Sequence, residues 1–244
     1  MTDDITPKLK ALGLKNCAAN LAAIIGTATE KNLSFPDTLE RLLDLELEQR
    51  RLTRIATRFK ESRLDEKTTI DRFDFDFHIS RKNQKTKIIN LMGLSFIKEK
   101  KDVILIGNPG VGKSFVAKAI AYAATQAGIK TLFSSTMDMI NHLIAAEADR
   151  SLLKKLQYYQ SPDLLVCDEI GYLSLGTQGS NLFFQVISAR HEKKSTIITT
   201  NLPFADWGKV FESTTVASAI ADRLVYNSEI LIMEGSSYRK KINK

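Results

Sequence analysis

The chain has 244 residues, of which 43% are hydrophobic and 8% aromatic, and its formal net charge is +7. This composition is ordinary for a globular protein with a buried core and excludes a disordered chain. No stretch contains the 18 or so apolar residues of a membrane span, and the N-terminus MTDDITPKLK lacks the basic-then-apolar pattern of a secretory signal. Cys17 and Cys167 lie far apart without metal-ligand spacing, so we expect a reduced, cytoplasmic protein with no membrane partner.

Residues 1–66 predict a small all-helical N-terminal domain. Pro7 is tolerated in the first turn of one helix, and a second helical pattern runs from about Cys17 to Lys31, broken or bent near Gly26. The residues SFPD at 34–37 are typical of the start of a third helix, which we expect to reach about Ser62. Its apolar stripe at helical spacing comprises Leu39, Leu42, Leu43, Leu52, Ile55, Ala56 and Phe59.

Arginines recur every fourth residue on another face of the third helix, at Arg50, Arg54 and Arg58. Acidic residues precede them, and pairs four residues apart such as Glu46–Arg50 would form a solvated, ion-paired face. The alternative is a face that contacts DNA phosphates. The sequence leaves both interpretations open.

Residues 67–101 predict a basic linker that packs on the domain after it. Phe73, Phe75 and Phe77 alternate there, and we expect packing groups rather than ligand contacts from them. A basic run follows, in which Arg81 and Lys82 are candidate DNA contacts.

The excess positive charge lies at the flanks of the chain's largest segment. Residues 71–101 and 236–244 each carry a net charge of +4, whereas residues 102–235 carry −2. Basic flanks beside a slightly acidic core favour contacts with a nucleic-acid backbone. A merely solubilising basic surface is the alternative.

From residue 102 to 244, short apolar runs alternate with longer helical patterns. The expected strands are 103–106, 131–135, 164–167, 196–200 and 230–233. This alternation predicts an α/β fold in which a five-stranded parallel sheet has helices on both faces.

The stretch GNPGVGKS, residues 107–114, follows the first of these strands and precedes a helical pattern from Phe115 to Ala127. In that context G-x-x-x-x-G-K-[ST] predicts a P-loop, with Lys113 facing the β and γ phosphates and the Ser114 hydroxyl on Mg²⁺. We therefore expect ATP and Mg²⁺ as cofactors. The predicted nucleotide contacts are Gly107, Asn108, Pro109, Gly110, Val111, Gly112, Lys113, Ser114 and Phe115.

Two further strand ends carry polar side chains. The apolar run at 164–167 ends in Asp168 and Glu169, which places both carboxylates at the phosphate edge of the sheet. Asp168 is the predicted Mg²⁺ ligand, and Glu169 the group that polarises a water for attack on the γ-phosphate. Asn201 ends the next strand and could hold this water, although an Asn after a strand is often only a turn residue. In such enzymes we expect this strand to lie between the P-loop strand and the acidic strand.

In this order, the P-loop, the acidic pair and the strand-end Asn resemble those of the AAA+ ATPases. Specifically, the chain is similar to the IstB-type transposition helper ATPases, which are relatives of the DnaC and DnaI helicase loaders. The likeness covers nearly the whole chain. It rests on the P-loop, PDLLVCDEIGYL (162–173), the NLPF-x-x-W run (201–207), AIADRLVYNS (219–228) and SYR (237–239).

The resemblance implies roles for two arginines. Arg223 matches the arginine finger, which reaches the γ-phosphate bound by a neighbouring subunit, and Arg239 matches the second sensor, which acts within its own subunit. Arg190 is a rival finger candidate, against a structural ion pair with Glu192 or an interface acid. By resemblance we also expect no C-terminal helical lid domain.

The resemblance implies an ATPase that assembles as a ring or spiral on duplex DNA with little sequence preference. It would recruit a transposase, and hydrolysis would disassemble the complex or commit the insertion. Lys154 and Lys155 are further candidate DNA contacts. The alternatives are a replicative helicase loader, a small-molecule kinase and a nucleotide-dependent scaffold without turnover.

Overall fold

The computed structural model describes residues 4–239 of the chain. They divide into two compact units, one up to Thr57 and one from Arg58 onward, and each is described by itself.

The first unit is helical, as predicted. Its helices are α1 (Ile5–Ala11), α2 (Lys15–Glu30) and the greater part of α3 (Phe35–Glu61). Helix α2 continues through Gly26 instead of ending there. The unit's small core joins Cys17, Leu21 and Leu42. Leu39 and Leu43, from the predicted apolar stripe, each remain 42% exposed, so that stripe is a core stripe only in part.

The segment predicted as a linker contains a regular helix. It comprises η1 (Ile70–Arg72), η2 (Phe75–Phe77), α4 (Ile79–Met92) and α5 (Ser95–Lys98). The ring nitrogen Nδ1 of His78 caps α4 by accepting from the Ser80 amide at 3.1 Å. Helix α4 has an apolar face despite its basic residues, since Ile88 and Leu91 are buried in the core of the second unit. Phe73 is buried in the same core, as its expected packing role requires.

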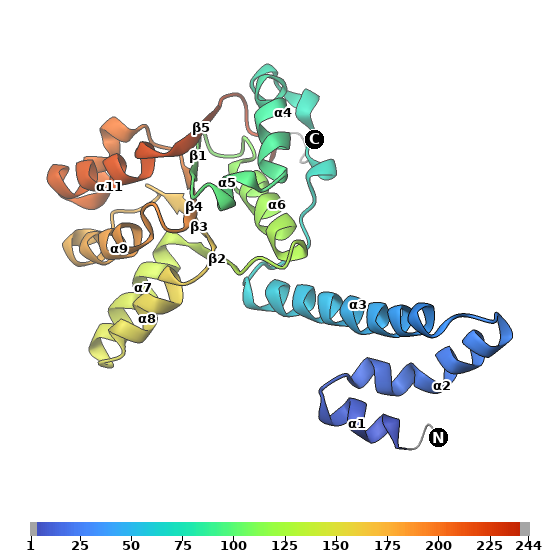
Figure 1. Cartoon of the computed structure of the whole chain (residues 1–244). Helices are drawn as coiled ribbons and strands as arrows, with labels where there is room; N and C mark the ends of the chain where they lie inside the picture. Colours follow the sequence, from blue (N-terminus) through green and yellow to red (C-terminus); the bar gives the residue numbers. More distant parts are fainter. Residues whose placement is uncertain (1–3, 240–244) are drawn as a thin grey trace. The chain divides into compact units, whose positions relative to one another are not determined.

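The second unit contains a five-stranded parallel sheet with strand order β2-β3-β4-β1-β5 (Figure 1). Its strands are β1 (Asp102–Gly107), β2 (Thr131–Ser135), β3 (Leu164–Ile170), β4 (Ser195–Thr200) and β5 (Ser228–Met233). All four neighbouring pairs are parallel. Strand β4 lies between β1 and β3, which confirms the expected position of the Asn201 strand.

Helices cover both faces of this sheet, with α4, α5 and α6 on one side and α7, α8, α9 and α11 on the other (Figure 1). The remaining elements are α6 (Lys113–Gln126), α7 (Thr136–Ala148), α8 (Leu152–Gln160), α9 (Gly176–Arg190), η3 (Phe204–Asp206), α10 (Trp207–Phe211) and α11 (Thr214–Tyr226). Val103 and Leu105 face one core while Ile104, between them, faces the other. Successive side chains of a strand point to opposite faces, so apolar runs give a sheet buried on both sides. The predicted α/β fold is confirmed.

Candidate nucleotide site

The P-loop connects the end of β1 to the start of α6. Gly112 has φ of 106°, and a Cβ atom there would lie 2.6 Å from the Phe73 ring, so both backbone and space require glycine. Helix α6 begins at the next residue, Lys113. A helix N-terminus presents unpaired amide groups and a partial positive charge, which together favour a bound phosphate.

Lys113 closes the loop on itself. Its ammonium group donates to the carbonyl oxygens of Gly107 at 2.7 Å and of Asn108 at 3.0 Å. Burial lowers the pKa of Lys113 below its ordinary value and the charge of Arg239 acts in the same direction, while the carboxylates of Asp168 and Glu169 oppose them. A phosphate would supply further compensating charge to this half-buried ammonium group.

Ser114 and Asp168 meet below the loop. The Ser114 hydroxyl donates to Asp168 Oδ1 at 2.9 Å. A hydroxyl and a carboxylate at this separation are hard oxygen donors, which suit Mg²⁺. Among residues 4–239 there is no cluster of three or more His, Cys, Asp or Glu side chains that could hold a metal. The pair therefore fits a Mg²⁺ ion that takes its other ligands from phosphate and water.

Glu169 is turned by an irregularity of β3. The register with β4 shifts between Cys167 and Ile170, and Glu169 has φ of 62°, in the left-handed region. Its amide donates to the Thr199 hydroxyl at 2.9 Å, and that hydroxyl donates to Asp168 Oδ1. Bulges next to active sites commonly redirect a side chain in this way.

Lys113, Ser114 and Glu169 line one cavity of about 550 Å³, and Asp168 is connected to it through its hydrogen bond with Ser114. It is lined by Arg72, Phe73, Asp74, Arg81, Pro109, Gly110, Gly112, Lys113, Ser114, Phe115, Glu169, Tyr172, Thr199, Thr200, Asn201, Tyr238 and Arg239. The P-loop, Glu169, Asn201 and Arg239, distant in sequence, are thus brought together. A pocket with convergent polar groups and a perturbed lysine is the expected form of a ligand site.

The segment after β5 brings Arg239 to this cavity. The Tyr238 amide donates to the Gly110 carbonyl at 2.9 Å. The Glu234 amide donates to the Ser80 hydroxyl at 2.9 Å, which ties the start of the segment to α4. Residues 234–239 therefore run along the P-loop.

The family model for IstB-like ATP binding proteins matches residues 7–244. The chain belongs to this family. It is 34% identical over 237 residues to a protein of insertion sequence IS232 from Bacillus thuringiensis subsp. berliner, covering 97% of this chain and 94% of the relative. It is 35% identical over 235 residues to a protein of insertion sequence IS21 from Pseudomonas aeruginosa, covering 96% and 87%. The names of both relatives refer to ATP binding.

Among solved structures, the chain is similar to the DnaC helicase loader, with a TM-score of 0.59 and 26% identity over 68% of this chain and 96% of that one. The IstB-like chain thus has the P-loop AAA+ fold that its motifs predicted. Family and fold confirm the resemblance.

Arg81, a candidate DNA contact of the IstB-like chain, is buried, so this prediction is wrong. Arg81 is 3% exposed, so its guanidinium is not available to a DNA backbone. It donates to the carbonyl oxygens of Val111 and Asp74, both at 3.0 Å, and packs against the Phe73 ring with its Cζ 4.5 Å from the centroid. The sequence pattern showed a basic run but not which of its members faces the P-loop.

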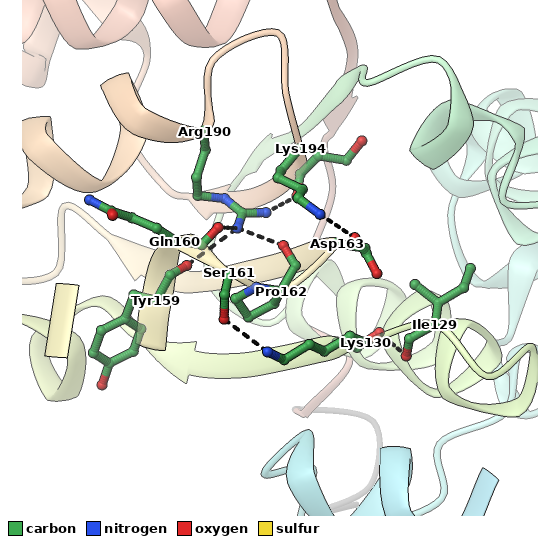
Figure 2. Close-up of polar contacts among 11 residues, drawn as sticks. Ile129, Lys130, Tyr159, Gln160, Ser161, Pro162, Asp163, Arg190 and Lys194 are labelled. Atoms are coloured by element: carbon green, nitrogen blue, oxygen red, sulfur yellow. Dashed lines mark hydrogen bonds and ion pairs between the residues drawn. The ribbon is translucent and has the colours of Figure 1, made fainter. Parts of the chain in front are cut away.

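Arg190, the rival finger, is 1% exposed and lies inside the fold. It donates to the carbonyl oxygens of Tyr159, Gln160 and Pro162 at 2.8–3.3 Å and to that of Ser195 at 2.5 Å (Figure 2). Burial lowers its pKa to about 10, which keeps the group charged at neutral pH. Its partners are these carbonyls and the Thr196 hydroxyl rather than Glu192. Arg190 is therefore structural, as its alternative interpretation held, but the expected ion pair with Glu192 is wrong.

Arg223 stands on α11, away from its own chain's cavity lining. It is half-buried; its Nη1 donates to the Ala219 carbonyl at 2.9 Å, and its Cζ lies 4.7 Å from the Phe184 ring centroid. No acidic partner fixes it among the described ion pairs.

The remaining candidate DNA contacts differ in their surroundings. Arg50 pairs with Glu46 at 2.9 Å, as the spacing on the helix predicted. Arg58 pairs with Glu61 at 3.0 Å. Arg54, Lys82 and Lys154 are exposed and Lys155 is half-buried. Between residues 4 and 239, no helix is both long and apolar enough to cross a membrane.

Proposed function

We propose that this chain is the ATPase subunit of a transposition complex: it binds and hydrolyses ATP and assembles on duplex DNA. The observation that carries the proposal is the convergence of Lys113, Ser114, Glu169 and Asn201 on one cavity in a chain of an insertion-sequence family, with Asp168 hydrogen-bonded to Ser114. A P-loop followed by a strand-end acidic pair supplies the phosphate contacts, the Mg²⁺ ligand and the general base with which ATP can be hydrolysed.

Different side chains of the chain would bind ATP and hydrolyse it. Lys113 and the amides of the loop bind the phosphates. Asp168 and Ser114 hold Mg²⁺, which when bound neutralises charge on the β and γ phosphates. Glu169 acts as the general base that polarises the attacking water, and Asn201 orients that water. Arg239 contacts the γ-phosphate from its own chain.

Arg223 completes the site of a neighbouring subunit. It lies outside its own cavity lining, so its charge is available to a second copy rather than to its own nucleotide. An arginine supplied to the transition state accelerates phosphoryl transfer by several orders of magnitude in other P-loop enzymes. Hydrolysis would thereby depend on assembly into a ring or spiral.

The assembly would bind duplex DNA through exposed basic residues such as Arg54, Lys82 and Lys154. Contacts to phosphates do not distinguish bases, so little sequence preference is expected. Bending a site of 20–30 base pairs costs about 1–6 kcal/mol, which contacts from several subunits would offset. The bent complex would recruit the transposase, and hydrolysis would disassemble it or commit the insertion.

A replicative helicase loader is the second candidate function. The observation that favours it is the structural likeness to the DnaC helicase loader. Such a protein would use the same ATPase core but act on a replicative helicase rather than on a transposase.

Electron microscopy of the protein with duplex DNA and a non-hydrolysable ATP analogue tests the proposal. We expect a ring or spiral around bent duplex, absent when the nucleotide is omitted. The matched control is Lys113→Ala, which should give no assembly. Particles that form only with a replicative helicase, and not on duplex alone, would favour the loader and contradict the transposition role.

A further inference from the structure

We propose that Thr199 is a positioning residue that sets both carboxylates of the site through a single hydroxyl group. The inference rests on the proposed ATPase function and assigns a residue to it that the sequence patterns did not single out. Its basis is the point where β3 and β4 lose their register.

The register of β3 and β4 leaves two residues opposite one. Cys167 pairs with Ile198 and Ile170 with Thr200, so that Asp168 and Glu169 both face Thr199. This is the two-against-one count of a β-bulge, which leaves a backbone group of the bulged strand without its usual ladder partner. At this bulge the Glu169 amide donates instead to the Thr199 hydroxyl at 2.9 Å.

The same hydroxyl donates to Asp168 Oδ1. A threonine hydroxyl has one hydrogen to donate and lone pairs to accept with, so it can serve both neighbours at once. Thr199 is 1% exposed, and water therefore does not replace either bond easily. Asp168 Oδ1 also accepts from Ser114 at 2.9 Å, which links the hydroxyl of Thr199 to the proposed metal ligands.

The bond to Glu169 supports an unfavourable backbone conformation. Glu169 has φ of 62°, a region that non-glycine residues avoid. This conformation places its side chain on the cavity while Asp168, its neighbour, faces Ser114. Without the Thr199 hydroxyl the amide would lack its acceptor, and the peptide could relax toward ordinary strand geometry. Both carboxylates would then move from their working positions.

The test compares Thr199→Val, which removes the hydroxyl while nearly preserving the shape, with Thr199→Ser, which keeps it. The matched control is Thr196→Val, at the other end of β4. Thr196 is also 1% exposed, but its hydroxyl accepts from Arg190 at 3.1 Å and lies away from the cavity lining. Three properties are measured on the intact protein. They are ATP turnover with DNA, the Mg²⁺ dependence of ATP binding, and amide hydrogen exchange, which is followed in the segment 164–172.

For Thr199→Val we expect kcat to fall about 10- to 100-fold, the range for partners that orient metal ligands, with KM for ATP within about threefold of wild type. The Mg²⁺ concentration for half-maximal ATP binding should rise about tenfold. Exchange at the Glu169 amide should accelerate. Thr199→Ser should remain near wild type in all three measurements. Thr196→Val should lower stability without changing turnover per folded molecule.

Wild-type turnover and Mg²⁺ dependence in Thr199→Val would overturn the inference, as would equal losses in Thr199→Val and Thr196→Val. If the wild type binds ATP with Mg²⁺ but releases no phosphate, the proposed hydrolysis fails. The role of Thr199 is then decided by the Mg²⁺ dependence of binding and the exchange of the Glu169 amide.

Discussion

Asp102 begins the P-loop strand with a carboxyl group that is 8% exposed. Its Oδ1 accepts from the Thr196 amide at 2.6 Å on the neighbouring strand β4. Burial raises the pKa of Asp102 to about 7, against the opposing effects of that hydrogen bond and of the nearby Arg190 charge. This carboxyl group on an inner strand makes the stability of the fold depend on pH, although it takes no part in the proposed chemistry.

The raised pKa of Asp102 makes the free energy of unfolding depend on pH. An unfolded Asp has a pKa near 3.9, so between about pH 4 and 7 the folded form retains a proton that the unfolded form has lost. The Asp102 contribution therefore lowers the free energy of unfolding as pH rises through that window, by roughly 4 kcal/mol in total, and is constant above it. Asp102→Asn keeps an acceptor for Thr196 and removes the titration.

Chemical denaturation of wild type and Asp102→Asn at pH 5 and pH 8 measures this effect. We expect the variant to gain stability relative to wild type on going from pH 5 to pH 8. The same difference between the two proteins at both pH values would contradict the assignment.

At the scale of elements, Arg190 joins the end of α9 to the segment that leads into β3 and to the start of β4 (Figure 2). Replacing it with methionine would leave several buried carbonyl oxygens without donors, each at a cost of about 1–3 kcal/mol. We expect Arg190→Met to lower the free energy of unfolding by about 3 kcal/mol or more. Arg223→Met, on a half-buried side chain with one carbonyl contact, should lower it by less than about 1 kcal/mol.

Denaturant titration of the two variants at neutral pH checks this difference. It also separates a structural arginine from a finger, because Arg223→Met should lose turnover while it remains folded. Equal destabilisation by the two substitutions would contradict the structural role of Arg190.

Elements with strong local signals were predictable from the sequence. The five strands followed from apolar runs, and the position of β4 between β1 and β3 followed from the order of the P-loop, the acidic pair and Asn201 in the sequence. The positions of β2 and β5 were not predicted. Helix α4 was not predicted, because its basic run from Arg81 obscures the positions of Ile88 and Leu91. The buried state of Arg81 depends on the fold of the P-loop beside it, and residue type alone gives no sign of that.

The residues of the candidate site also include some that the sequence predicted and one that it did not. Gly112, Lys113 and Asp168 belong to patterns whose chemistry requires those residue types, and they share the cavity or its hydrogen bonds as expected. Thr199 was missed because its role arises from a register shift between two strands. A polar residue two positions before Asn201 was the one available signal, and threonine is common in strands.

In the proposed assembly, each ATPase site is shared between two subunits. Two variants inactivate opposite halves of that site. Lys113→Ala should lose ATP binding but retain Arg223, and Arg223→Ala should bind ATP but lack the finger. Each alone should release no phosphate on duplex DNA, because Lys113→Ala does not assemble by itself and Arg223→Ala lacks the finger at every site.

Phosphate release by a mixture of Lys113→Ala and Arg223→Ala on duplex DNA is therefore the most direct measurement. If Arg223 of one subunit completes the site of the next, mixed assemblies contain intact sites, and we expect turnover to return at a level that depends on the mixing ratio. A mixture as inactive as either variant alone, under conditions in which both are incorporated into the same particles, would contradict the shared site.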